Sequence, residues 1–224
     1  MKLIPRLLIQ TVIGLPILGA FIFVPAGTLD YWQGWTFLVV FTVSSSLLGL
    51  YLAIFDPALL ERRIKAGPRA ETRPVQKIIM SLAFASMFGL LIFSAFDYRF
   101  GWSPVPMWVS ILGNLLVVVG LAIDLQVFRE NSYAASTIQI MAGQKIISTG
   151  LYGLVRHPMY LGALIMVLGM PLALDSYWGL LLVLVNFFVF MLRIFDEEKM
   201  LRHELAGYEE YTHQVRYRLV PGVW

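Results

Sequence analysis

The chain has 224 residues, of which 58% are hydrophobic, 14% are charged and none is cysteine. Soluble domains average about 45–50% apolar and about 25% charged residues. The composition therefore excludes a disordered chain, a nucleic-acid-binding domain and a disulfide-stabilised scaffold. The mean hydropathy of +0.74 instead indicates a protein whose solvent is a lipid bilayer. Without cysteine, the chain also has neither a thiolate nucleophile nor a cysteine–zinc site.

Six apolar runs follow one another along the chain, separated by polar breaks. They cover residues 7–24, 32–55, 78–96, 108–128, 158–174 and 178–195. Five of them are near the length of about 20 residues that crosses a bilayer, whereas the run 158–174 is short. Only Asp175, Ser176 and Tyr177 join the last two runs, which predicts an antiparallel helical hairpin. We therefore expect an all-α integral membrane bundle of about six transmembrane helices.

The distribution of the basic residues favours six spans. With the N-terminus in the cytoplasm, 16 of the 17 lysines and arginines lie on the cytoplasmic side, and only Arg99 lies outside. Removing one span destroys this asymmetry, so the positive-inside rule predicts that both termini are cytoplasmic. In a prokaryote this membrane would be the inner or plasma membrane. The first run is longer than the apolar core of a secretory signal and precedes no A-x-A site, so we expect it to be retained.

Two polar segments complete the organisation. The segment 56–77 is basic, and we expect it to lie on anionic lipid headgroups rather than to take part in catalysis. The segment 196–217 is charged, with apolar residues at roughly helical spacing. It predicts amphipathic cytoplasmic helices that either anchor the chain at the interface or cap the bundle. We treat the chain as one structural domain, with the first four spans in 1–128 and the remaining elements in 129–224.

Polar residues near the span ends gather at the cytoplasmic level. They come from three parts of the chain, namely Asp124 with Arg129, Glu130 and Asn131, then Arg156 and His157, and then Arg193 with Asp196, Glu197 and Glu198. Polar groups in membrane spans are costly and usually face the bundle interior or a cavity. The sequence therefore predicts a polar cavity that opens to the cytoplasm.

Four of these residues also have a simpler explanation. Asp124 can pair with Arg129 across the last helical turn. Arg193 and Glu197 have the spacing of an exposed ion pair, which is worth only about 0.3–0.5 kcal/mol. His157 can be an ordinary interfacial histidine, although its neighbours favour a binding role.

Those neighbours predict a helix start that suits a ligand. Pro158 marks where the fifth helix begins, because proline is favoured at the first helical position. The free N–H groups and the positive dipole end at such a start suit a carboxylate. Tyr152 and Tyr160 flank this point as aromatic walls suited to a cation or an adenine ring.

The C-terminal half resembles a known family. The residues that carry the resemblance are Thr149-Gly150-Leu151-Tyr152, Arg156-His157-Pro158-Met159-Tyr160-Leu161-Gly162, Asp196-Glu197-Glu198, Gly207-Tyr208-Glu209-Glu210-Tyr211 and Val215 to Pro221. In this order and spacing they are similar to the C-terminal signature of the isoprenylcysteine carboxyl methyltransferase and phospholipid methyltransferase superfamily. The likeness covers about residues 125–221, and the first three spans share only their hydrophobicity.

The resemblance implies a membrane-embedded methyltransferase that uses S-adenosyl-L-methionine, without a metal, on a lipophilic acceptor. It implies that the cofactor lies in a cytoplasm-facing pocket closed by the C-terminal segment. The implied cofactor-binding residues are Gln139, Gln144, Lys145, Ile146, Ile147, Tyr152, His157, Pro158, Met159, Tyr160 and Glu197. The resemblance also places Arg193 toward the substrate, so that Arg193 and Glu197 are the candidate catalytic residues.

The identity of the methyl acceptor stays open, as does the oligomeric state. A carboxylate acceptor, as in isoprenylcysteine carboxyl methylation, is ionised near pH 7, and Arg193 would orient it through paired hydrogen bonds. A phospholipid amine would first have to lose a proton, which Glu197 or Glu198 would accept. In both cases the partners are lipids or lipophilic small molecules and not nucleic acid.

Two other classes of protein are less favoured. Sterol-type membrane reductases that use NADPH are similar in a P-N-Y-x-G-E pattern, whereas this chain has Met159 and Ala163 in place of the Asn and the Glu. A small transporter or scaffold would carry polar groups near mid-bilayer on several helices. Asn186 is the one strong candidate for such a group, and it can equally bond a neighbouring helix.

Overall fold

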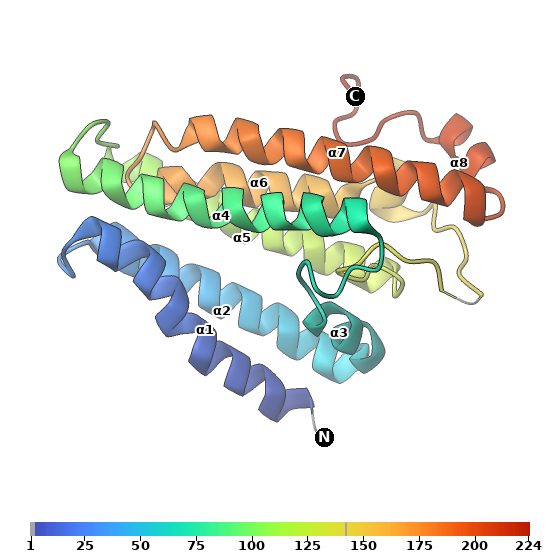
Figure 1. Cartoon of the computed structure of the whole chain (residues 1–224), viewed down its shortest axis with the longest axis horizontal. Helices are drawn as coiled ribbons and strands as arrows, with labels where there is room; N and C mark the ends of the chain where they lie inside the picture. The colour runs from blue at the N-terminus through green and yellow to red at the C-terminus, as the bar shows by residue number, and fades with distance from the viewer. Residues whose placement is uncertain (1–2, 142) are drawn as a thin grey trace.

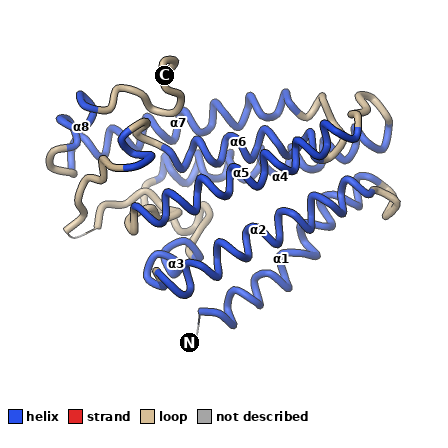
Figure 2. The backbone as a smooth tube through the Cα atoms, turned by 180° about the vertical axis from the view of Figure 1, so that it is seen from behind, coloured by secondary structure: helices blue, strands red, loops and turns tan. Residues whose placement is uncertain are grey.

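The computed structural model describes residues 3–141 and 143–224, and every regular element in this part of the chain is helical (Figures 1 and 2). The elements are α1 (Leu3–Ala26), α2 (Trp32–Phe55), α3 (Pro57–Ile64), α4 (Pro74–Phe100), α5 (Met107–Glu130), the 3-10 turn η1 (Gly150–Gly153), α6 (Pro158–Ala173), α7 (Leu180–Glu204) and α8 (Tyr208–Gln214). The all-α prediction is confirmed. Lys2, which the topology argument placed in the cytoplasm, lies outside the described residues.

Each predicted apolar run corresponds to one long helix. Four of these helices, α1, α2, α4 and α5, are long and apolar enough to cross a membrane. The fifth, α6, is apolar but has only 16 residues. The sixth, α7, has 25 residues and becomes charged after its apolar part, because Arg193 and the acidic residues that follow it continue the same helix. The structure is therefore a helical membrane bundle with four clear candidate spans.

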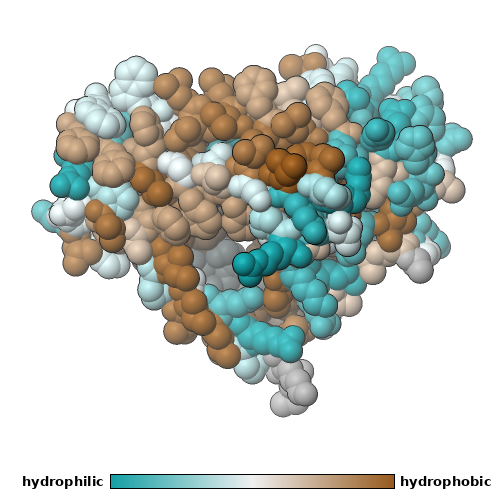
Figure 3. All heavy atoms as spheres, viewed as in Figure 1, coloured by the Kyte–Doolittle hydropathy of each residue, from teal (hydrophilic) through white to brown (hydrophobic). Residues whose placement is uncertain are grey.

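The two ends of the bundle differ in charge. The start of α1, α3, α8 and the connection between α5 and α6 lie toward one end, and the chain after α8 folds back so that Trp224 contacts α7 at Phe187 and Phe195 (Figure 1). Hydrophilic side chains gather at that end, whereas apolar side chains cover most of the remaining face in view (Figure 3). The predicted grouping of basic segments at one end is thus present in the fold.

Glycines allow α5 and α6 to pack very closely. A Cβ atom at Gly113 would lie 2.3 Å from the backbone N of Ala173, and one at Gly120 would lie 2.5 Å from the carbonyl O of Gly162. Small residues at a helix–helix contact are typical of membrane proteins, because they let the backbones approach. This contact fixes α6, whose first turn contributes to the cavity described below.

Segment 56–77 is only partly a surface segment. It contains α3, which begins at Pro57 and is capped by Asp56, whose Oδ1 accepts a hydrogen bond from the N–H of Leu59 at 2.9 Å. Its later part turns inward, so that Glu71 and Gln76 are buried. The headgroup interpretation did not anticipate these inward-facing residues.

Candidate functional site

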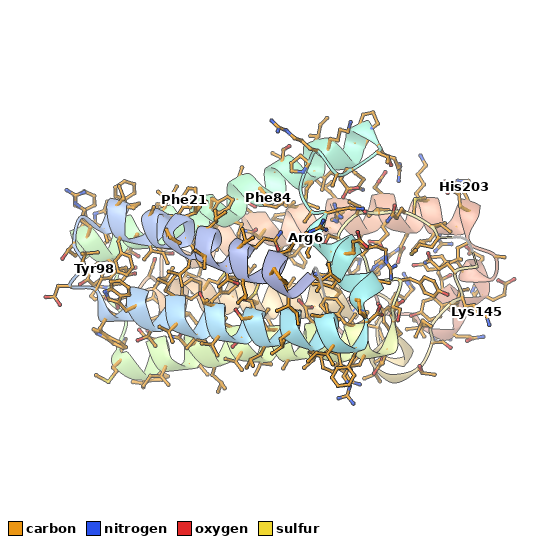
Figure 4. The ribbon with its side chains drawn as sticks, turned by 90° about the horizontal axis from the view of Figure 1, so that it is seen from below. Arg6, Phe21, Phe84, Tyr98, Lys145 and His203 are labelled. Carbon is orange, nitrogen blue, oxygen red and sulfur yellow. The ribbon has the colours of Figure 1, made fainter. Side chains whose placement is uncertain are left out.

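One cavity lies at the charged end of the bundle, where α6, α7, α8 and the connection after α5 meet. The space between its lining residues is about 850 Å³ when the open solvent at its mouth is included. All the candidate residues line it, namely Gln139, Gln144, Lys145, Ile146, Ile147, Tyr152, His157, Pro158, Met159, Tyr160, Arg193 and Glu197. Figure 4 shows one of them, Lys145, at this end of the molecule, with Tyr98 at the opposite end.

Arg193 is the centre of a hydrogen-bond network in the cavity wall. Its Nε donates to the hydroxyl of Tyr160 at 2.9 Å, and its Nη1 donates to Oε1 of Gln76 at 3.0 Å. Its Nη2 donates to Oε1 of Glu71 at 2.9 Å and to the carbonyl of Ser136 at 2.8 Å. Four of its five N–H groups are therefore used. The paired hydrogen bonds that we predicted toward a substrate carboxylate would require Arg193 to release a protein partner.

Tyr160 connects Arg193 to Glu197. Its hydroxyl accepts from Arg193 and donates to Oε2 of Glu197 at 2.8 Å. Within the described residues, Arg193 forms its ion pair with Glu71 at 2.9 Å and not with Glu197. The exposed i, i+4 ion pair is therefore not the arrangement that the fold adopts, because the aromatic hydroxyl lies between the two charges.

Glu198 joins α7 to the start of α6. Its side chain is 4% exposed, its Oε1 accepts from Nε of Arg156 at 2.8 Å, and the same oxygen lies 3.3 Å from Nε2 of His157. Its other oxygen accepts from Nε of Arg218 at 3.0 Å. His157 is thus a buried, hydrogen-bonded residue of the cavity wall, and not an ordinary interfacial histidine.

The C-terminal segment runs along the start of α6. The backbone N–H groups of Arg156 and His157 donate to the carbonyls of Tyr217 and Arg218, each at 2.9 Å. The guanidinium of Arg156 also donates to the carbonyl of Val215 at 2.9 Å. These bonds hold the segment after α8 against the residues that begin α6.

Asp124 does not join the cavity lining and does not pair with Arg129. It faces α6, where a Cβ atom at Gly162 would lie 2.7 Å from its Oδ1. That oxygen is buried without a hydrogen-bond partner among the described residues. The prediction failed because the close packing of α5 against α6 turns this face of α5 inward.

Sequence reasoning missed several residues of the site. Glu71, Gln76 and Ser136 bond Arg193, and Tyr208 and Tyr211 line the cavity. The two tyrosines were visible in the sequence as the aromatic residues of the Gly207 to Tyr211 motif. Glu71 gave no such signal, because it lies among basic residues in a segment without an apolar pattern.

The hydroxyl of Tyr208 is a buried donor without a partner. The residue is 5% exposed, and its hydroxyl makes no hydrogen bond within the described residues. Burial, and then the negative charge of Glu198, raise the pKa of Tyr208, so the group is protonated near pH 7. An unpaired buried polar group is unfavourable by about 1–3 kcal/mol. A ligand in the cavity that offers this hydroxyl a hydrogen-bond acceptor atom would therefore bind more tightly.

We expect Tyr208→Phe to separate ligand binding from stability. Without a ligand, the melting temperature should stay equal or rise, because the variant removes an unpaired hydroxyl from a buried position. The affinity for a cavity ligand should fall by about tenfold, as expected for one hydrogen bond. Thermal unfolding with and without S-adenosylhomocysteine measures both quantities. A variant that binds as tightly as the wild type would show that this hydroxyl contacts no ligand.

Part of the chain matches a known protein family, and this part includes most of the residues that line the cavity. Residues 108–206 match the family model described as phospholipid methyltransferase. This segment is a little under half of the chain, and over it the chain is similar to the membrane methyltransferase superfamily that includes this family. The predicted resemblance is therefore confirmed, and the matched segment contains every candidate site residue named from the sequence.

A curated relative of this chain differs in activity from the matched family. It is a Delta(14)-sterol reductase from Mus musculus, 30% identical over 162 residues, which are 63% of this chain and 39% of the relative. The chain thus spans well under half the length of this relative. The activity of the whole reductase is accordingly only an alternative for this protein.

Proposed function

We propose that the protein transfers a methyl group from S-adenosyl-L-methionine to a lipophilic acceptor at the membrane face where the cavity opens. The single observation that supports this most is the cavity itself, which gathers all the candidate residues of the family segment. The cofactor supplies a methyl carbon activated by the adjacent sulfonium. In the same proposal, α6 and α7 complete six spans, and the charged end of the bundle faces the cytoplasm, as we predicted for both termini.

The residues around the cavity fit this cofactor. The N–H groups of Met159 and Tyr160 lie in the first turn of α6, where a helix provides no backbone partners, and they suit a carboxylate. The Glu197 carboxylate suits a cationic group, and the unpaired Tyr208 hydroxyl suits an acceptor atom. We propose that these groups, with Gln139, Gln144, Lys145, Ile146, Ile147, Tyr152, His157 and Pro158, hold and orient the cofactor.

The hydrogen-bonding capacity of the site bears on the acceptor. Arg193 has one N–H left, on Nη1, whereas Glu197 has one oxygen bonded to Tyr160 and makes no second hydrogen bond within the described residues. Glu197 is therefore the group with free capacity to accept a proton from an acceptor amine. This supports a phospholipid-type amine over a carboxylate that needs a pair of donors. Arg193 would hold the side chains of Tyr160 and Glu197 in position, so that the reacting groups are oriented.

A second cavity supports an acceptor with a hydrocarbon chain. It has a volume of about 1490 Å³ including its opening and lies between α1, α2, α4 and α6. The buried residues of α1, Ile22, Phe23 and Ala26, lie at its C-terminal end. Toward its N-terminal end the helix diverges from α4 (Figure 4). The lining is mostly apolar, and a hydroxyl in it, that of Ser45, donates to the carbonyl of Phe41 at 2.7 Å. Such a cleft suits the apolar part of a lipid acceptor.

We expect Gly14→Trp to block this second cavity. Gly14 lines it, and a Cβ atom there would meet no atom within 4 Å, so an indole can enter without displacing the backbone. The KM for a long-chain acceptor should rise by about tenfold or more, while the affinity for S-adenosylhomocysteine stays unchanged. That rise corresponds to at least about 1.4 kcal/mol, less than the burial of one large apolar side chain supplies. Gly89→Trp is the control. A Cβ atom at Gly89 also meets no atom within 4 Å, but Gly89 does not line the second cavity. An unchanged KM in Gly14→Trp would exclude the cavity from acceptor binding.

The alternatives receive less support from the structure. The similarity to a sterol reductase favours a reductase, but Met159 and Ala163 replace the Asn and Glu of the pattern in such enzymes. Asn186 accepts from the hydroxyl of Ser86 at 3.0 Å and donates to the carbonyl of Leu182 at 2.9 Å. Its side chain is thus used in helix packing, which weakens the transporter interpretation.

Calorimetry with S-adenosylhomocysteine tests the proposal. The wild type should bind, Glu197→Ala and His157→Ala should bind at least about tenfold more weakly, and the exposed control His203→Ala should bind normally. Unchanged binding in both site variants would overturn the site assignment. Binding of NADPH in place of S-adenosylhomocysteine would favour the reductase. Incubation with a labelled methyl donor and a lipid extract then identifies the acceptor.

A further inference from the structure

Two buried residues outside the family segment reach into the candidate site. Glu71, in the connection between α3 and α4, is 3% exposed, and Gln76, in the first turn of α4, is fully buried. Both lie outside residues 108–206, which match the family model. They bond Arg193 across sequence separations of more than 100 residues.

Glu71 connects two walls of the cavity. Its Oε1 accepts from Nη2 of Arg193 at 2.9 Å, and its Oε2 accepts from the backbone N–H of Ile138 at 3.3 Å. Ile138 belongs to the connection after α5 that lines the cavity. One carboxylate therefore holds the guanidinium and the lining segment in a fixed relation.

Gln76 connects the same guanidinium to a second ion pair. Its Oε1 accepts from Nη1 of Arg193 at 3.0 Å, and its Nε2 donates to the carboxylate of Asp196. Asp196 also accepts from Nη2 of Arg73 at 2.7 Å. The start of α4 is thus joined to α7 at two places, Arg193 and Asp196.

These bonds remove the freedom of a long side chain. An unrestrained arginine retains up to about 2 kcal/mol of rotamer entropy, and a buried guanidinium without an anion is strongly unfavourable. Glu71 supplies the anion and Gln76 fixes the orientation, so that Nε of Arg193 points at the Tyr160 hydroxyl. That hydroxyl in turn donates to Glu197.

We propose that Glu71 and Gln76 are positioning residues of the methyl-transfer site. They hold Arg193 so that its Nε fixes the Tyr160 hydroxyl, and through this hydroxyl the carboxylate of Glu197. This inference rests on the proposed function, and it assigns part of the site to the segment before the family match. Neither residue needs to touch the cofactor or the acceptor.

The experiment compares Glu71→Gln with Glu61→Gln in the full chain. Both variants remove one negative charge from the same segment, but Glu61 is exposed on α3. The first readout is the rate at which phenylglyoxal modifies Arg193, followed by mass spectrometry of the peptide. Loss of a charge-assisted hydrogen bond should make Arg193 roughly tenfold more reactive in Glu71→Gln and leave it unchanged in Glu61→Gln.

The second readout is methyl transfer. In Glu71→Gln, kcat should fall by about 10-fold to 100-fold, the size expected when a catalytic group is misplaced by about 1 Å. The KM for the acceptor and the affinity for S-adenosylhomocysteine should stay within about threefold of the wild type, a difference of less than 1.4 kcal/mol. Gln76→Leu, which keeps the ion pair of Glu71 and Arg193, should show the same pattern more weakly. It serves as the test if Glu71→Gln does not fold.

Each outcome has a distinct meaning. Unchanged Arg193 reactivity and unchanged kcat in Glu71→Gln would overturn the positioning role while leaving the proposed function intact. A parallel loss of kcat, cofactor affinity and melting temperature would show a merely structural role and would also overturn it. A wild type that neither binds S-adenosylhomocysteine nor transfers a methyl group would refute the proposed function. The reactivity of Arg193 would still decide whether Glu71 holds its side chain.

Discussion

Replacing Glu198 by alanine is expected to lower the free energy of unfolding by about 3–5 kcal/mol. The substitution leaves the guanidinium of Arg156, which is 4% exposed, buried without its carboxylate partner. It also releases Arg218 and His157, so that the C-terminal segment and the start of α6 lose their common partner. Thermal unfolding in detergent, followed by circular dichroism, measures the effect.

Glu204→Ala is the matched control, because Glu204 lies on the same helix and is exposed. It should change the free energy of unfolding by less than about 0.5 kcal/mol, as is usual for surface substitutions. Equal effects of the two substitutions would show that the buried cluster around Glu198 contributes nothing specific to stability.

The same carboxylate gives the stability a defined dependence on pH. Glu198 lies three residues beyond the apolar run of α7. Its burial raises the pKa, but the hydrogen bonds that it shares with His157 and then Arg156 outweigh burial and hold the pKa at about 2, below 4.5. Because the pKa is depressed in the folded state, this stabilisation is present above pH 4.5 and is lost as the pH falls toward 2. The melting temperature of the wild type should fall over this interval by more than that of Glu198→Ala.

The fold and the position of much of the candidate site could be predicted because both depend on local sequence patterns. Long apolar runs locate membrane helices without knowledge of their neighbours, and α2 covers the predicted residues 32–55. Pro158 marks the start of α6 because its ring fixes the backbone there. The candidate residues are close in sequence to these landmarks, so their convergence followed from the order of the helices.

The remaining features depend on packing that no local pattern reveals. Glu71 meets Arg193 across 122 positions, and a carboxylate in a basic segment is typical of an exposed surface. Asp124 faces α6 and not Arg129, because glycines let the two helices approach until one face of α5 is covered. From the sequence we also predicted that the guanidinium of Arg193 is free to donate paired hydrogen bonds to a substrate. In the structure, four partners from distant elements use most of its hydrogen-bonding capacity.

Gly120→Leu should be among the most damaging substitutions within the apolar part of the bundle. A Cβ atom there would lie 2.5 Å from the carbonyl O of Gly162 and 2.7 Å from the backbone N of Met166. Because these neighbours are backbone atoms that cannot rotate away, α6 as a whole must move. Overpacking of this kind lowers stability by about 1–3 kcal/mol or more. Gly89→Leu is the control, because a Cβ atom at Gly89 meets no atom within 4 Å.

The same substitution should also weaken ligand binding, because α6 carries part of the cavity in its first turn. A shift of α6 away from α5 moves Met159 and Tyr160 relative to Glu197, which lies on α7. We therefore expect Gly120→Leu to lower the affinity for S-adenosylhomocysteine even at temperatures where the variant is folded, whereas Gly89→Leu should bind normally. Normal affinity in a folded but destabilised Gly120→Leu would mean that the α5–α6 contact supports the bundle without setting the geometry of the site.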